Sequence, residues 1–227
     1  MSLPLLRTLR DLPRKSITAL LVAVIAFASI APAPTVASPF ETSECFSKDL
    51  GRRLQACSEL LAQPGLSDAT RASAFAMRAL SLSLLGRFQD AINDYDKALA
   101  IDPNQPVALN NRAWAKYRSG QHASAWPDIR RSLELDAGSP HAYDTRAHLH
   151  QAEGASKRAY DDYVRAMELG GGEMIKLYQC GLQAEGHYTG AVTGIVTDEL
   201  LSGLKACTKS RKCDPLPPDE ECKVAMS

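Results

Sequence analysis

An internal repeat of 34 residues constrains the fold of this 227-residue chain more than any other feature. Three blocks follow one another without gaps, at residues 72–105, 106–139 and 140–173. A fixed period of this length is typical of an array in which each block is one supersecondary unit that packs on the next. Five places in the block keep one residue type: Arg78, Arg112 and Arg146 at the seventh, Ala79, Ala113 and Ala147 at the eighth, Gly86, Gly120 and Gly154 at the fifteenth, Ala91, Ala125 and Ala159 at the twentieth, and Asp94, Asp128 and Asp162 at the twenty-third.

Each block predicts two helices separated by a turn at its glycine. In the second half of the first block, Ala91, Tyr95 and Ala98 recur at spacings of four and three, which makes an apolar stripe along a helix. Asp102-Pro103 ends that helix, because a proline disfavours helical geometry in the residue before it. The stripe is too narrow to form a core alone, so we expect it to pack on the first helix of its own block and on the next block.

The period and these columns resemble the tetratricopeptide repeat, a helix–turn–helix unit. The first block carries the resemblance most completely, with Ala79, Gly86, Ala91, Ala98 and the terminal Pro103 in place. The resemblance implies an all-α fold, a stack of about three repeats at residues 72–105, 106–139 and 140–173. It also implies that the first helices of the repeats form a concave face, on which the family binds peptides or partner helices.

The arginine at the seventh place departs from the family, which usually has an aliphatic residue there. In an antiparallel helix pair this place lies near the twenty-third, so each arginine is expected to face the aspartate of its own block. A structural ion pair with a partly buried arginine stem is one interpretation, and a charged ligand groove is the alternative. The predicted pairs are Arg78 with Asp94, Arg112 with Asp128, and Arg146 with Asp162.

The concave face is expected to present the second, fifth, ninth, twelfth and thirteenth residues of each block. In the first block these are small or apolar: Ser73, Ala76, Leu80, Ser83 and Leu84. Because Ala76 and Leu80 stand where the family's basic pocket for a carboxylate would need lysine and asparagine, that pocket is not expected. In the second block the first of these residues is Val107. Trp114 of the same block either faces a ligand or packs against the protein itself. The predicted partner-binding residues are Asn110, Trp114, Tyr117, Arg118, His141, Asp144 and His148.

Three of these residues, His141, Asp144 and His148, have the spacing of one helix face and invite a metal interpretation. No ligand from a second helix is evident, and nothing fixes a coordination geometry. We therefore expect no metal and no other cofactor, and we expect the histidines to be solvated groove residues.

The N-terminus has the pattern of a secretory signal peptide over residues 1–37. Basic residues precede an apolar run at 17–31, and small residues follow it, with cleavage expected after Ala37; an uncleaved signal anchor is the alternative. Removing these residues leaves 22 Lys and Arg against 25 Asp and Glu, a net charge of −3. Clustered positive charge is therefore lacking, and no nucleic-acid partner is expected. The predicted location is the periplasm or the exterior of the cell, without membrane insertion after cleavage.

All six cysteines lie beyond the expected cleavage site, an even number that fits disulfides in an oxidising compartment. Cys45 and Cys57 lie in the segment 38–71, where residues 49–63 predict a helix that covers the first repeat. Their spacing suits a bridge that ties the incoming chain to this helix. The other four cysteines follow the repeats: Cys180, Cys207, Cys213 and Cys222.

The segment 174–227 breaks the 34-residue register and is expected to form a small, disulfide-rich helical module. Part of it resembles the three-helix peptidoglycan-binding domain of cell-wall hydrolases, although Thr193, Thr197 and Leu200 depart from the family's pattern. The resemblance places Cys180 and Cys207 on packed helices and so implies that they bridge, which leaves Cys213 for Cys222; by sequence alone all three pairings of the four stay open. The residues that carry the resemblance are Tyr178, Gln179, Leu182, Gly186, Tyr188, Gly190, Gly194 and Leu204.

No catalytic motif is found in the sequence, so the chain is not expected to be an enzyme. The hypothesis is an exported, non-catalytic interaction scaffold that holds a peptide or protein partner in the concave groove. The alternative is a peptidoglycan- or carbohydrate-binding protein that acts through residues 174–227. A third interpretation of that module is a degenerate cap that solvates the end of the repeat stack.

Overall fold

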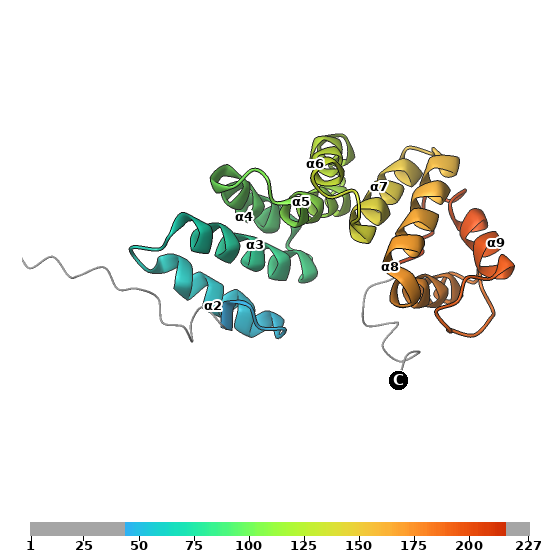
Figure 1. Cartoon of the computed structure of the whole chain (residues 1–227), viewed down its shortest axis with the longest axis horizontal. Coiled ribbons are helices and arrows are strands. Elements are labelled where there is room, and N and C mark those ends of the chain that lie inside the picture. The colour runs from blue at the N-terminus through green and yellow to red at the C-terminus, as the bar shows by residue number, and fades with distance from the viewer. Residues whose placement is uncertain (1–43, 217–227) are drawn as a thin grey trace, which may run out of the picture. The chain divides into compact units, whose positions relative to one another are not determined.

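The computed structural model describes residues 44–216, and within this range the chain is all-helical (Figure 1). The expected signal peptide and Cys222 lie outside the described residues. No helix within residues 44–216 combines the length and apolar character needed to cross a membrane. The helices are α2 (Leu50–Ala62), α3 (Asp68–Leu84), α4 (Phe88–Ile101), α5 (Pro106–Arg118), α6 (His122–Leu135), α7 (Pro140–Ala152), α8 (Ser156–Ala184) and α9 (Asp198–Cys207).

The three repeats are the helix pairs α3–α4, α5–α6 and α7 with the first part of α8, and each pair packs on the next along the chain. Alanines at the eighth and twentieth places are fully buried in every pair, so the two helices of a repeat approach closely. The glycine at the fifteenth place turns the chain between them. Its φ is 74°, 80° and 79° in the three repeats, a left-handed geometry that favours glycine.

The helix α2 precedes the first repeat and packs on α3. Asp49 caps its N-terminus by accepting a hydrogen bond from the backbone N–H of Arg52. Leu60 and Cys57 of α2 are fully buried in a small cluster with Cys45 and Ala74. This helix therefore covers the exposed side of the first repeat.

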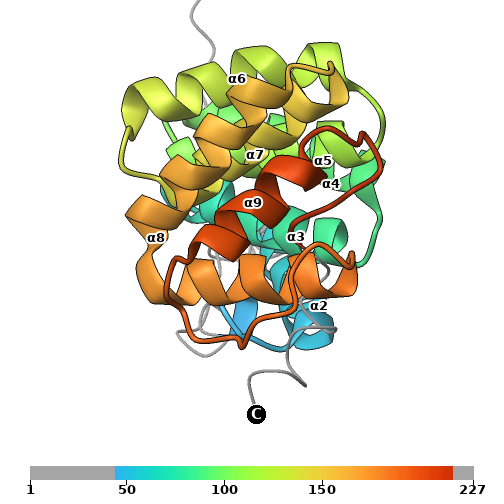
Figure 2. The ribbon, with the colours of Figure 1, turned by 90° about the vertical axis from the view of Figure 1, so that its right-hand side faces the viewer.

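The long helix α8 is bent at Gly171, which has a non-helical backbone with φ of 61° and ψ of −152°. The residues before the bend complete the third repeat, and those after it begin the C-terminal module, with α9 packed alongside (Figure 2). One hydrophobic cluster joins the two parts: Tyr163 and Met167 of the repeat lie with Tyr178, Leu182 and several other buried side chains of the module. The module is thus built onto the third repeat through a shared core.

The loop between α8 and α9 is held by the buried amide of Gln179. Its Oε1 accepts from the backbone N–H groups of Thr193 and Gly194 at 2.9 and 2.8 Å, and its Nε2 donates to the carbonyl of Ile195 at 3.0 Å. At Gly203 in α9, any Cβ would fall well inside van der Waals contact with the backbone carbonyl oxygen of His187. Only glycine therefore lets α9 approach this loop so closely.

Two disulfides are present among the described residues. Cys45 bonds to Cys57, with their Cα atoms 4.6 Å apart, and Cys207 bonds to Cys213, with their Cα atoms 5.3 Å apart. The predicted bridge between Cys180 and Cys207 is therefore wrong, and so is the one between Cys213 and Cys222. The reason is local: α9 ends at Cys207, and the turn that follows brings the chain back within bonding distance six residues later.

Candidate partner-binding face

The structure brings the arginine and the aspartate of each repeat into a bidentate ion pair. The arginine Nε and Nη2 atoms lie 2.6 and 2.9 Å from the carboxylate oxygens in the first repeat, 2.8 and 2.5 Å in the second, and 2.8 and 2.7 Å in the third. The aspartate side chains are 5–10 % exposed. Two parallel N–H···O bonds to a buried carboxylate fix the packing of one helix of the repeat against the other.

The pair in the second repeat has further partners. The Nη1 atom of Arg112 donates to Asp96 of α4 at 2.7 Å, and Lys116 donates to Asp128 at 2.8 Å. Arg112 therefore connects the second repeat to the first as well as closing its own repeat.

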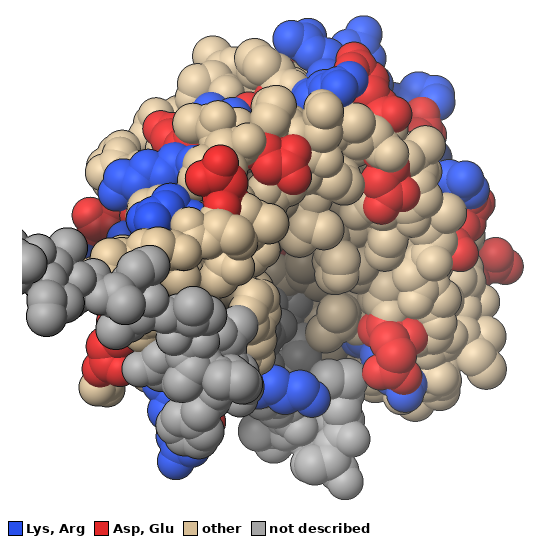
Figure 3. Space-filling view, turned by 60° about the vertical axis from the view of Figure 1, so that its left-hand side comes forward, with Lys and Arg blue, Asp and Glu red and all other residues tan. Residues whose placement is uncertain are grey.

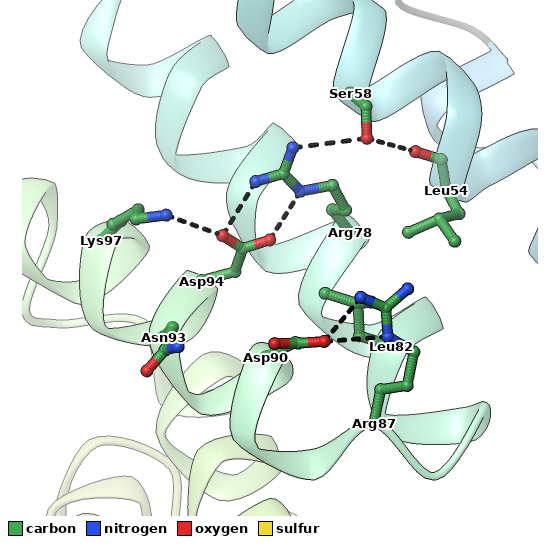
Figure 4. A pocket seen from close by; sticks show the side chains of 9 residues that line it. All are labelled: Leu54, Ser58, Arg78, Leu82, Arg87, Asp90, Asn93, Asp94 and Lys97. Atoms are coloured by element: carbon green, nitrogen blue, oxygen red, sulfur yellow. Dashed lines mark hydrogen bonds and ion pairs between the residues drawn. The ribbon is translucent and has the colours of Figure 1, made fainter.

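A charged cleft of about 390 Å³ surrounds the pair of the first repeat, between α2, α3 and α4 (Figure 4). Arg78 reaches both Asp94 and the hydroxyl of Ser58, while Arg87 pairs with Asp90 at 2.6 Å. The remaining charged side chain, Lys97, also pairs with Asp94. Every charged side chain that lines the cleft has a partner there, but Arg78 and Lys97 share Asp94, so the lining carries one positive charge in excess.

The concave face is open at the first two repeats. A cleft of about 190 Å³ lies there between α3 and α5, and most of its lining is apolar. Val107 is 67 % exposed and Phe46 is 47 % exposed at this site. The hydroxyl of Tyr95, which also lines the cleft, is buried beside the side chain of Asn111. One face of the molecule is visibly hollowed, and the walls of the hollow are mostly uncharged (Figure 3). The other lining residues include Ser73, Ala76, Leu80, Ala108 and Asn111.

At the third repeat, the concave face is covered by the chain that follows α9. Nε2 of His148 lies 3.0 Å from Oδ1 of Asp214, and its Nδ1 lies 2.9 Å from the backbone carbonyl of Asp144. The side-chain amide of Gln151 donates to the carbonyls of Ser210 and Cys213 at 2.5 and 2.7 Å. We call residues 208–216 the tail segment, and it is fixed to α7 by these contacts.

Aromatic rings surround His148 on the sides that the tail segment does not cover. Its ring centroid lies 5.1 Å from that of Trp114, 5.4 Å from Tyr117 and 5.2 Å from Tyr163. Arg118 lies over the ring of Trp114 at 5.4 Å. The second and third repeats are therefore joined here through side chains of α5 and α7.

Two carboxylates hold His148 in its protonated form. Burial alone would lower the pKa of His148, but Asp144 and Asp214 outweigh it and raise that pKa to about 9. Burial also acts to raise the pKa of Asp214, yet its hydrogen bond to His148 and the charges of His148 and Arg118 leave that pKa below its usual value. Burial raises the pKa of Asp144, although His148 and the hydroxyl of Tyr178 act in the opposite direction.

The seven predicted partner-binding residues divide into two groups in the structure. Trp114 and Tyr117 are partly exposed, and Arg118 and His141 are exposed, so all four are accessible from solvent. The other three are buried: Asn110, Asp144 and His148. The prediction that the histidines are solvated is wrong for His148, because the tail segment and the aromatic rings cover it.

Sequence reasoning missed Asp214, the residue of the tail segment that meets His148. It lies 66 positions from its partner and outside the repeat register. The only available signal was the cysteine pattern around it, which left the pairing open. Without the bond between Cys207 and Cys213, the path of the tail segment could not be derived.

Comparisons with known proteins agree with this architecture. The fold is that of a helical repeat protein, a stack of paired helices with one concave face. A family description, "Tetratricopeptide repeat", matches residues 72–105, and a second one of the same description matches residues 94–126. These matches identify residues 72–126 as tetratricopeptide repeats, and the described helices form a stack of the same kind. No curated protein sequence matches it.

Solved structures of other helical repeat proteins are similar to this chain. A crystal structure of MamA is 15 % identical with a TM-score of 0.52, over 84 % of this chain and 96 % of that one. MamA 41-end from Desulfovibrio magneticus RS-1 is 18 % identical with a TM-score of 0.50, over 61 % and 76 %. The first repeat domain of Spaghetti (RPAP3), bound to the HSP90 peptide SRMEEVD, is 29 % identical with a TM-score of 0.42, over 44 % and 79 %. The two MamA structures support the fold alone.

Proposed function

We propose that this chain is an exported, non-catalytic scaffold that holds an extended peptide on the concave face of its first two repeats. The observation that carries the proposal is the open apolar cleft between α3 and α5. Repeat arrays generally use their concave surface for binding, and tetratricopeptide repeat proteins are generally non-catalytic scaffolds. The partner is a protein segment that inserts an apolar side chain beside Leu80 and Val107.

The lining of the cleft explains why an apolar side chain would bind there. Val107 and Phe46 leave apolar surface in contact with water, and covering it contributes about 25 cal/mol for each Å² removed from solvent. The side-chain amide of Asn111, which also lines the cleft, adds a polar group that can hydrogen-bond to the backbone of the peptide. An extended peptide supplies both kinds of group at once.

Export is supported by two independent features. The N-terminal residues have the basic, apolar and small-residue pattern of a signal peptide. Both disulfides of the described residues require an oxidising compartment to persist. Fusion of residues 1–60 to a reporter enzyme that is active only after export tests this part of the proposal. Replacing Arg7, Arg10, Arg14 and Lys15 by glutamate should abolish the reporter activity, and an inactive wild-type fusion would refute export.

The binding proposal is tested with a displayed peptide library selected on the full chain. The affinity of an enriched peptide is then measured for the Val107→Asp variant and for the control variant Ile195→Asp. Ile195 is also β-branched and is 65 % exposed, but it lies outside the cleft. We expect at least a tenfold loss for Val107→Asp and no change for Ile195→Asp. Equal affinities for the two variants would refute the cleft as the binding site.

Wall binding through residues 174–227 is the second candidate function. The residues that carry the resemblance pack together, with Tyr178, Gln179, Leu182 and Leu204 fully buried, and the loop beside them exposes Ile195. Retention of the full chain on insoluble peptidoglycan, lost in Ile195→Asp, would favour this function. Retention that is unchanged by Ile195→Asp, or no retention, would count against it.

A further inference from the structure

We propose that the concave face at α5 and α7 contains a recognition site for a partner's carboxylate, and that the tail segment occupies this site as an internal ligand. The inference rests on the proposed function, because it describes how the same groove continues beyond the open cleft. The carboxylate that fills the site here is that of Asp214.

The first argument is the construction of the site. His148 is 1 % exposed, and its Nε2 points to the tail segment while its Nδ1 is fixed by the backbone of α7. Asp214, in contrast, keeps 38 % of its side chain exposed. The buried histidine of this contact therefore belongs to the repeat, and the more exposed carboxylate, which a partner could displace, belongs to the tail segment. With Asp144 on its other side, the Nε2 of this buried imidazolium can donate to an anion that takes the place of Asp214.

The second argument is that the tail segment has the form of a short docked peptide. Asp214 accepts a hydrogen bond from the backbone N–H of Leu216 at 3.0 Å, which closes a tight turn. Leu216 packs against the core shared by the third repeat and the module. Gln151 binds the backbone carbonyls that precede Asp214. One carboxylate, one apolar side chain and a few main-chain bonds are the contacts by which a groove recognises a peptide.

The third argument is continuity with the open cleft. Helix α5 contributes Val107 to the cleft at its N-terminal end, and Trp114 and Arg118 near the covered site at its C-terminal end. A peptide that lies along α5 from the open cleft reaches the place that the tail segment now fills. The partner therefore contains an acidic residue followed two positions later by an apolar residue, and it must displace Asp214 and Leu216 to bind fully.

The test measures binding of a fluorescein-labelled peptide, Ser-Arg-Lys-Ser-Asp-Pro-Leu amide, to the full chain by fluorescence anisotropy. The peptide copies residues 210–216 with serine in place of Cys213. In the wild type, the tethered tail segment competes at a high effective concentration. We expect Asp214→Ala to bind the peptide at least tenfold more tightly than the wild type, and we expect a peptide with asparagine in place of aspartate to lose this binding.

Two controls keep the result interpretable. Glu173→Gln removes an equal charge from a side chain that is 82 % exposed and should bind like the wild type. Asp214→Asn keeps the shape of the side chain and replaces Asp214→Ala if circular dichroism shows that the latter is unfolded. Equal affinity of wild type and Asp214 variants, equal binding of the asparagine peptide, or no binding at all would overturn the inference. The proposed function fails separately, since its test depends on Val107.

Discussion

The ion pair of the second repeat allows a quantitative prediction about stability. Arg112→Met removes three hydrogen bonds, two to Asp128 and one to Asp96. The carboxylate of Asp128 is 6 % exposed and keeps only Lys116 as a charged partner. Breaking a buried pair on one side costs about 3–5 kcal/mol, and the remaining lysine favours the lower end, about 3 kcal/mol. For a protein of this size this corresponds to a fall in Tm of roughly 10 °C.

The assay is urea denaturation followed by circular dichroism, with two companion variants. Arg112→Met with Asp128→Leu removes both charges and should restore most of the lost free energy of unfolding, because no buried carboxylate is left unpaired. Arg131→Met breaks a pair with Glu134 in which the side chains are 47 % and 62 % exposed, and it should cost less than about 1 kcal/mol. A loss for Arg112→Met as small as that for Arg131→Met, or a double variant no more stable than the single one, would refute the structural interpretation of these pairs.

Three further predictions concern the C-terminal half. Because the pKa of His148 is raised to about 9, its protonation stabilises the folded state fully below about pH 6.5. This contribution, on the order of 3 kcal/mol, should be lost as the pH rises through about 9. Urea titrations across this range should show the decline in the wild type and not in His148→Gln. Gly203→Ala forces a Cβ against a backbone carbonyl and should cost more than about 2 kcal/mol, whereas Gly51→Ala, whose Cβ meets only ordinary contacts, should change the unfolding free energy little. Gln179→Leu should leave loop backbone groups unpaired, cost about 1–3 kcal/mol and speed amide hydrogen exchange at residues 193–195; unchanged exchange would contradict the role of this amide.

The repeat stack could be predicted from the sequence because its determinants are local and periodic. The turn glycine, the small residues and the end of the helix at Asp102-Pro103 all recur or act within one block of 34 residues. The same periodicity placed each arginine opposite its aspartate, since the geometry of an antiparallel helix pair fixes which residues face each other. Arg112 shows the limit of this reasoning, because its third contact, with Asp96, crosses to the preceding repeat.

The contacts of the C-terminal module could not be predicted in this way. Nothing periodic relates Asp214 to His148, and the bond between Cys207 and Cys213 was one of several possible pairings. The assignment of His148 and Asp144 to an open groove followed the repeat register correctly but could not include a segment from outside the register that covers them. A concave position is therefore only potentially accessible until the path of the flanking chain is known.

Because the third repeat and the C-terminal module share a core, further repeats can be added between the existing repeats but not between the third repeat and the module. Inserting a copied block at the boundary between residues 105 and 106 would preserve the interfaces that each repeat forms with its neighbours, because successive repeats pack in a similar manner there. A copy of residues 106–139 inserted after residue 173 would instead place Ile129 and Leu133 where Tyr163 and Met167 now pack against the module, so the shared core would have to repack. The number of repeats can thus grow in the middle of this protein, while its C-terminal boundary is fixed.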